Sequence, residues 1–222
     1  MANRDFDLII YGASSFVGQI MTRYLAEHIG FSGTVKWAIA GRSSSKLEQL
    51  RLSLGAEAAE LPIIIADADD ASALAELCQS SRVIATTVGP YALYGEQMIK
   101  ACAENGTDYC DLCGEAYWIK RMIVKYADAA KESGARIVSC CGFDSIPSDL
   151  GVHFLQQQGH KRFDKYFSTI KLAVNAMKGG ASGGTLASMI EAVKAAKSDP
   201  KLRKEMNNPY ILCPEKSDLR HP

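Results

Sequence analysis

The sequence predicts an α/β fold with a doubly wound parallel sheet, because short apolar runs alternate with amphipathic stretches. The apolar runs lie at residues 6–11, 35–40, 61–66, 82–88, 107–112 and 135–141. The stretches between them carry apolar residues at three- and four-residue spacing, at 16–29, 44–55, 70–79, 94–105 and 115–133. This alternation is typical of a parallel sheet with helices on both faces and right-handed crossovers. The ligand groove of such a sheet lies at the carboxyl ends of its strands.

The first predicted strand, at 6–11, ends in a glycine turn, and a helix follows within four residues. Gly12 suits the sharp turn, and Gly18 allows the helix to pack closely on the strand. Ser15 stands where a third glycine is expected, and its side chain crowds the approach to phosphate unless its hydroxyl donates to the anion. A strand–turn–helix of this kind opens a Rossmann unit and points N–H groups at a pyrophosphate. The cofactor contacts predicted here are Gly12, Ala13, Ser14, Ser15, Phe16 and Val17.

The end of the second strand predicts which dinucleotide is bound. An acidic residue at this point accepts from the ribose 2′-hydroxyl of NAD, but none is present. Instead, Arg42, Ser43 and Lys46 form a cationic, donor-rich corner that fits a 2′-phosphate. The interpretation is NADP(H) over NAD(H). The alternative is that Arg42 caps a solvated turn.

The later strand ends supply further candidates. Asp67 is placed near adenine, and Asp70 is expected to cap the next helix. The nicotinamide half is predicted to lie against Val88, Gly89 and Pro90. The candidate proton donors on loops near the same end are Tyr91, Tyr94 and Asp144.

Two acidic residues after the fifth strand have two alternative interpretations. Asp111 and Glu115 either orient a substrate or cap the long helix after Gly114.

The pattern changes after about residue 150. A helix through Gln158 leads to a run at 163–175 with strand character, then to a Gly/Ser segment before an Ala-rich helix that ends near Lys197. Ser182 and Thr185 at that helix start are predicted substrate contacts. The tail from Asp199 to Pro222 has no periodic apolar face. Residues 1–150 are therefore predicted to form an NAD(P)-binding Rossmann domain, and 151–222 the incomplete start of an α+β substrate or dimerisation domain.

Composition narrows the class of protein. The 222 residues include 25 Lys+Arg and 25 Asp+Glu, which disfavours nucleic-acid binding through a broad basic surface. No apolar run approaches the ~20 residues needed to span a bilayer, and residues 1–5 are too polar for a signal peptide. An intracellular location is therefore expected, either cytoplasmic or peripheral to an internal membrane or lipid droplet.

The seven cysteines indicate free thiols in a reducing compartment. Cys110 and Cys113 have the spacing of a metal or redox pair, but no second pair of this spacing exists. Small buried apolar residues are the favoured interpretation, and no metal site is predicted.

Six segments together resemble a known family. They are Tyr11-Gly-Ala-Ser-x-Phe-Val-Gly18, Ala40-Gly-Arg-Ser43, Val88-Gly-Pro-Tyr91 with Tyr94-Gly95, Asp111-x-x-Gly-Glu115, Gly142-Phe-Asp-Ser-Ile-Pro-x-Asp-Leu-Gly151 and Ser182-Gly-Gly-Thr185. Their order and spacing resemble the saccharopine dehydrogenase-like oxidoreductases, especially the branch of trans-acting enoyl reductases of mycobacterial lipid synthesis. The resemblance covers nearly the whole chain and weakens after about residue 197.

The resemblance implies an NADP-binding domain followed by a larger α+β domain in a longer chain. It also implies hydride transfer between NADP(H) and a C=C (enoyl) or C=N bond of a small-molecule substrate of lipid type, with a role in glycolipid synthesis. Membrane association and a homodimer are left open. Two alternatives are a nucleotide-binding sensor or scaffold without turnover, and a true saccharopine reductase of lysine metabolism. A short-chain dehydrogenase is disfavoured because Lys120 follows Tyr117 by three residues rather than four.

Overall fold

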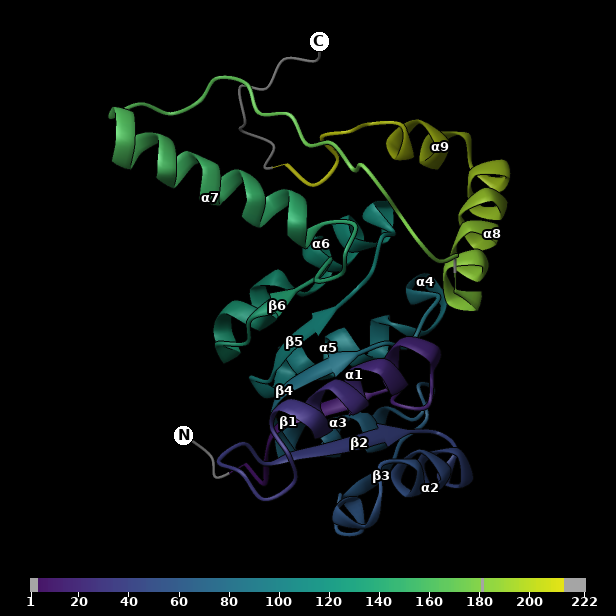
Figure 1. The fold of residues 1–222 in the computed structure, drawn as a ribbon. Helices are drawn as coiled ribbons and strands as arrows, with labels where there is room; N and C mark the ends of the chain where they lie inside the picture. The colour runs from purple at the N-terminus through teal and green to yellow at the C-terminus, as the bar shows by residue number, and fades with distance from the viewer. Residues whose placement is uncertain (1–3, 181, 214–222) are drawn as a thin grey trace.

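A computed structural model describes residues 4–180 and 182–213 of the chain. Within those ranges, six parallel strands form one sheet in the order β3-β2-β1-β4-β5-β6 (Figure 1). The strands are β1 (Phe6–Tyr11), β2 (Trp37–Gly41), β3 (Ile63–Ile65), β4 (Ser81–Thr86), β5 (Asp108–Asp111) and β6 (Ile137–Val138). The predicted doubly wound sheet is confirmed, and its strand order reverses between β1 and β4.

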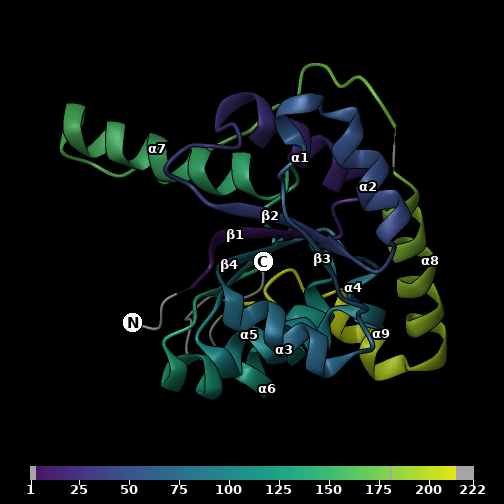
Figure 2. The ribbon, with the colours of Figure 1, turned by 90° about the horizontal axis from the view of Figure 1, so that it is seen from below.

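Helices cover both faces of this sheet (Figure 2). The helices of the described ranges are α1 (Phe16–His28), α2 (Ser44–Ser53), α3 (Ala71–Ser80), α4 (Tyr91–Tyr94), α5 (Glu96–Asn105), α6 (Ala116–Ser133), α7 (Ile146–Phe163), α8 (Gly183–Ser198) and α9 (Pro200–Met206), with a 3₁₀ turn at Ala56–Ala58. The first two pack on one face, and α3, α5 and α6 pack on the other. No helix in the described ranges has both the length and the apolar composition needed to cross a bilayer.

Two apolar cores hold the layers together. The smaller core, with Ile10, Ile39 and Leu47, joins α1 and α2 to the sheet. The larger core joins the opposite face to α3, α5 and α6, and it includes the fully buried Ile9 and Ile84. Burial of strand residues on both faces explains why these strands appear as continuous apolar runs in the sequence.

Register brings the ends of the central strands to one level. Tyr11 of β1 lies between Ala40 of β2 and Thr86 of β4. The turns that begin at Gly12, Gly41 and Thr87 therefore emerge side by side at the carboxyl edge, where ligands of open α/β sheets bind.

The predicted strand at 163–175 is wrong. These residues are irregular, and α7 extends to Phe163 rather than ending near Gln158. The side-chain amide of Gln156 takes both backbone groups of Phe167: Nε2 donates to its carbonyl at 2.9 Å, and its N–H donates to Oε1 at 2.7 Å. The backbone groups of Phe167 therefore bond to a side chain instead of a neighbouring strand.

The tail after Asp199 lacks a periodic apolar face, yet helix α9 forms at its start, over Pro200–Met206. Asp199 caps α9 by accepting from Lys201 N and Leu202 N, and Pro200 occupies the first turn. Leu202 and Ile211 are buried in the larger core. Two widely spaced apolar residues produce no periodic signal, yet they anchor the segment. The rest of the predicted tail, 214–222, lies outside the described residues.

Candidate functional site

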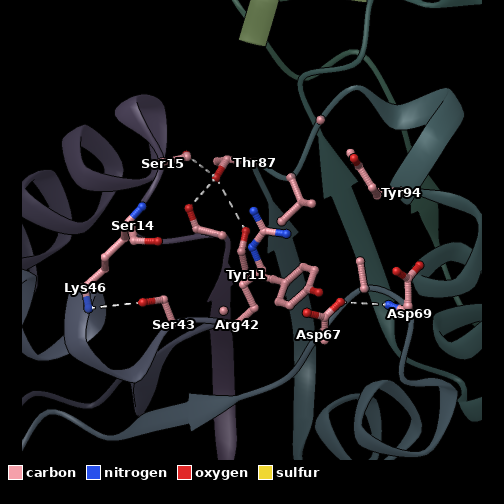
Figure 3. A pocket seen from close by; sticks show the side chains of 15 residues that line it. Tyr11, Ser14, Ser15, Arg42, Ser43, Lys46, Asp67, Asp69, Thr87 and Tyr94 are labelled. Atoms are coloured by element: carbon pink, nitrogen blue, oxygen red, sulfur yellow. Dashed lines mark hydrogen bonds between the residues drawn. The ribbon is translucent and has the colours of Figure 1, made fainter. Parts of the chain in front are cut away.

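A pocket of about 290 Å³ opens where β1, β2 and β4 end (Figure 3). Its lining comes from four successive strand ends and the helices after them: Tyr11, Gly12, Ser14, Ser15, Gly41, Arg42, Ser43, Lys46, Asp67, Ala68, Asp69, Thr87, Val88, Gly89 and Tyr94. The structure therefore joins the glycine turn, the cationic corner and the segment after β4 in one cavity. This cavity is called the first pocket below.

The glycine turn leaves no room for side chains at its two ends. Gly12 has φ +84°, and a Cβ there would lie 2.7 Å from Val88 Cγ2. A Cβ on Gly18 would lie 2.3 Å from the carbonyl oxygen of Gly12. Helix α1 thus begins in direct contact with the turn, and Ser14 and Ser15 just before the helix line the first pocket.

Ser15 acts as the N-cap of α1. Its Oγ accepts from Gly18 N at 2.9 Å and shares a 2.8 Å hydrogen bond with Thr87 Oγ1, which donates to the Gly12 carbonyl at 2.9 Å. The serine that replaces the expected glycine is therefore bonded within the protein, and with Thr87 it ties the turn to β4. Sequence reasoning missed Thr87.

The six predicted contacts of the glycine turn do not share one environment. Gly12, Ser14 and Ser15 line the first pocket, whereas Ala13 is fully buried in the smaller core. Phe16 and Val17 line a neighbouring cavity instead. Phe16 is 69% exposed there.

The cationic corner occupies the β2 side of the first pocket. The Arg42 guanidinium points into the cavity toward Thr87 (Figure 3). Ser43 caps α2 by accepting from Lys46 N at 3.5 Å, so both residues flank the same helix start. A phosphate here would meet a guanidinium, an ammonium and helix N–H groups together.

Asp67 and Asp69 line the opposite wall, after β3. Asp67 Oδ1 accepts from Asp69 N at 3.1 Å. Burial raises the pKa of Tyr11, and the nearby Asp67 carboxylate raises it further, so the hydroxyl stays protonated and donates to the Ala66 carbonyl at 3.4 Å. Asp70 caps α3 as predicted, accepting from Ser72 N and Ala73 N at 3.0 Å each.

A second pocket of about 590 Å³ adjoins the first and shares Ser15, Thr87 and Gly89 with it. Helices α8 and α9 close its far side (Figure 1). The full lining is Ser15, Phe16, Val17, Thr87, Gly89, Tyr91, Leu112, Gly114, Glu115, Ala116, Tyr117, Asp144, Ser182, Gly184, Thr185, Ser188, Met189, Ala192 and Met206. Among the described residues, this lining contains neither lysine nor arginine.

The three candidate proton donors lie in different surroundings. Tyr91 is buried in the second pocket, where its hydroxyl donates to the Thr86 carbonyl at 3.2 Å and accepts from Leu112 N at 3.4 Å. Burial, with Asp111 nearby, holds the Tyr91 pKa far above 10. Tyr94 is 40% exposed and lines the first pocket, and Asp144 is exposed and lines the second.

Asp111 is 3% exposed and is absent from the described lining of both pockets. Its carboxylate accepts from Tyr109 Oη at 2.7 Å, from Cys113 N and Cys140 N at 2.9 Å each, and from Ser139 Oγ at 3.2 Å. It therefore joins the loops that follow β5 and β6. A single sequence cannot reveal that link, because its partners are up to 29 residues away.

Glu115 is also buried, but it reaches the second pocket. Its carboxylate accepts from Tyr91 N at 3.0 Å, from Ala92 N at 2.8 Å and from Ser188 Oγ at 2.9 Å. Its side chain makes no capping bond to α6.

Ser182 and Thr185 both line the second pocket, and Ser182 caps α8 through Thr185 N at 3.2 Å. Sequence reasoning missed Ser188 and Met189 farther along this helix.

The seven cysteines are all free thiols. Cys78, Cys102 and Cys113 are buried, but Cys141 is exposed, so the prediction that the cysteines act as small buried residues does not extend to it.

Comparison with known proteins agrees with this geometry. The family model described as the saccharopine dehydrogenase NADP binding domain matches residues 8–138. A Mycobacterium tuberculosis protein, provisionally named a trans-acting enoyl reductase, is 41% identical over 213 residues, which cover 96% of this chain and 50% of that protein. The trans-acting enoyl reductase of Mycobacterium bovis is 40% identical over 217 residues, covering 97% and 51%. The chain thus spans about half the length of the curated relatives it matches.

Among solved structures, the saccharopine dehydrogenase of Saccharomyces cerevisiae superposes with a TM-score of 0.51 at 18% identity. The match covers 70% of this chain and 32% of the yeast enzyme. At that identity the likeness concerns the fold alone.

Proposed function

Because this chain belongs to the saccharopine dehydrogenase NADP-binding domain family, we propose that it is the cofactor-binding part of an NADPH-dependent reductase. The reductase would act on the C=C bond of an enoyl substrate of lipid type, as the names of the mycobacterial relatives suggest. The single observation that carries this proposal is the meeting of the glycine turn and Arg42 in one pocket, beside a second pocket of apolar character.

The polar groups of the first pocket support NADP(H) as its ligand, because they suit successive parts of this nucleotide. Gly12, Ser14 and Ser15 would face the pyrophosphate, while Arg42, Ser43 and Lys46 would hold the 2′-phosphate. Asp67, which lines the same pocket, would accept from the adenine amino group. The nicotinamide half would lie along Val88 and Gly89, of which Gly89 lines both pockets; the predicted contact Pro90 is buried and absent from the described lining of both.

The protein's own contribution is to orient the substrate and deliver a proton. NADPH, when bound, would supply the hydride, and a residue of the protein would have to supply one proton to the other carbon of the double bond. Tyr94 and Asp144 are the better candidates for this proton donor, because both are exposed. Tyr94 lines the first pocket and Asp144 lines the second. The Tyr91 hydroxyl already bonds to the Thr86 carbonyl, so Tyr91 is the weaker candidate.

The second pocket favours an uncharged substrate. A substrate such as saccharopine carries several carboxylates, which would need cationic partners in a cavity. The described lining offers Phe16, Val17, Leu112 and Met189 instead, and the Glu115 carboxylate is already bonded to three protein donors. This composition supports the enoyl-type substrate over the amino-acid alternative. Glycolipid synthesis, membrane association, a homodimer and the domain division at residue 150 stay predictions.

Fluorescence titration with NADPH and NADH tests the cofactor assignment, and NADPH oxidation with crotonyl-coenzyme A tests the reaction. The expected result is tighter binding of NADPH and oxidation that depends on the enoyl thioester. Equal affinity for the two nucleotides would contradict the role of the Arg42 corner. Tight NADPH binding without oxidation across a panel of enoyl and imine compounds would instead favour the sensor or scaffold.

A further inference from the structure

Glu115 lines the second pocket and holds the segment that follows Gly89, a residue shared by both pockets. The residue is 6% exposed, and both carboxylate oxygens accept hydrogen bonds. Oε2 accepts from Ala92 N, and Oε1 accepts from both Tyr91 N and Ser188 Oγ. The buried side chain at the start of α6 thereby contacts α4, 24 residues earlier in the chain, and α8, 73 residues later.

The two segments differ in what they adjoin, although Tyr91 and Ser188 both line the second pocket. The N–H groups of Tyr91 and Ala92 follow Gly89 and Pro90, the stretch proposed to border the nicotinamide. Ser188 lies on α8, which lines the second pocket with Ser188, Met189 and Ala192. A displacement on one side therefore changes the hydrogen bonding of the carboxylate that holds the other side.

We propose that Glu115 is a positioning residue that couples the loop beside the nicotinamide to helix α8, the wall of the second pocket. This inference rests on the proposed function, since it requires NADPH to occupy the first pocket. Dinucleotide that orders residues 87–92 would fix the orientation of the Glu115 carboxylate and, through Ser188, order α8 before the substrate enters. The apolar wall would then be set by the cofactor rather than by the substrate alone.

Ser188 offers the sharper variant, because Glu115 also holds α4 in place and its loss would disturb both sides. Ser188→Ala removes only the hydroxyl that links α8 to the carboxylate. Ser188→Thr keeps the hydroxyl and serves as the conservative rescue. Ser198→Ala is the matched control on the same helix, since the Ser198 hydroxyl donates only to helix carbonyls, those of Lys194 and Ala195.

The experiment is hydrogen–deuterium exchange of the whole protein with and without NADPH, after a fluorescence titration has established binding. In the wild type we expect NADPH to slow exchange in residues 87–95 and also in α8. In Ser188→Ala, residues 87–95 should keep this protection, but the NADPH-dependent protection of α8 should fall by about 2- to 12-fold, the range expected for one hydrogen bond. Ser188→Thr and Ser198→Ala should behave as the wild type does.

The outcomes separate the two proposals. If the wild type binds no NADPH, the proposed function fails. If it binds NADPH but α8 shows no NADPH-dependent protection, or if Ser188→Ala keeps that protection in full, the coupling is refuted while the cofactor assignment stands. A purely structural role for Ser188 would speed exchange in α8 equally with and without NADPH, and this result would also overturn the inference.

Discussion

At the scale of single residues, we propose that Arg42 sets the preference of the first pocket for NADP(H). Its guanidinium points into the cavity, and no acidic side chain stands at the end of β2 to accept from a ribose 2′-hydroxyl. The charge and the planar donor set fit a phosphate that only NADP carries. The preference should therefore depend on this one side chain far more than on the glycine turn, which faces the part common to both nucleotides.

Arg42→Ala should weaken NADPH binding by roughly 10- to 100-fold, since hydrogen bonds to a charged group contribute about 1.5–3 kcal/mol. NADH affinity should stay nearly constant, so discrimination between the two falls. Nicotinamide fluorescence titration measures both constants, and Arg23→Ala, an exposed substitution on α1, is the control. An unchanged dissociation constant for NADPH would contradict this role and favour the alternative that Arg42 caps a solvated turn.

Gly18→Ala should damage the glycine turn from inside the protein. The new Cβ would lie 2.3 Å from the Gly12 carbonyl oxygen and 2.8 Å from Ala13 Cα, both of them backbone atoms that cannot rotate away. We expect a loss of about 1–3 kcal/mol in the free energy of unfolding, together with much weaker NADPH binding.

Urea unfolding and NADPH titration together measure the effect of Gly18→Ala. Gly151→Ala is the matched control, because a Cβ on Gly151 meets nothing within 4 Å and its helix α7 gains from alanine. If Gly18→Ala were as stable and as competent as this control, α1 would not pack on the turn as described.

At the scale of elements, Arg4 ties the sheet to the helices on the side opposite the pockets. Its guanidinium donates to the carbonyls of Ser81 at 2.8 Å and Asn105 at 2.7 Å, and also to the Cys78 carbonyl. Cys78 and Asn105 lie at the C-terminal ends of α3 and α5, where a cation is favourable.

Arg4→Met keeps most of the aliphatic stem and removes the donors. The free energy of unfolding should fall by about 2–3 kcal/mol, because several carbonyls lose charge-assisted hydrogen bonds. Arg82→Met provides the comparison: Arg82 makes a 3.4 Å ion pair with Asp7, its side chain is 67% exposed, and its loss should cost below about 1 kcal/mol. Urea denaturation of both variants measures these losses. Equal losses in the free energy of unfolding would show that Arg4 is an ordinary surface cation.

The elements also show how far sequence reasoning reaches. Strand and helix periods located the sheet, and Gly12, Gly18 and Arg42 located the pocket, because each residue type answers a local geometric need. Asp111 and Glu115 were recognised as important, but their partners were not. A carboxylate in the sequence does not say which N–H groups the fold will bring to it.

The false strand at 163–175 and the missed helix α9 have a related cause. A strand needs a neighbouring strand, and the side chain of Gln156 took the backbone groups of Phe167 instead. Helix α9 needs only Asp199 as its cap and the burial of Leu202 against the larger core. Both outcomes depend on contacts between distant residues, which a periodic pattern in the sequence does not reveal.

At the scale of the whole molecule, the two adjoining pockets are lined largely by different parts of the chain. The lining of the first pocket runs from Tyr11 to Tyr94, whereas α8 and α9 complete the second pocket. The binding of nucleotide and of substrate should therefore be separable by mutation, and the chemistry of the second pocket should appear in the substrate preference.

For enoyl-coenzyme A substrates of increasing chain length, we expect kcat/KM to rise by about fourfold per added methylene until the apolar wall is covered, because burying one methylene contributes about 0.8 kcal/mol. Met189→Glu places a charge on that wall and should flatten the series while leaving the NADPH dissociation constant unchanged. Met177→Glu, at a side chain that is 82% exposed and outside the described lining, is the control. Steady-state NADPH oxidation measures the series. A slope near zero in the wild type, or faster oxidation with a dicarboxylic amino-acid substrate, would show that the second pocket does not select an apolar chain.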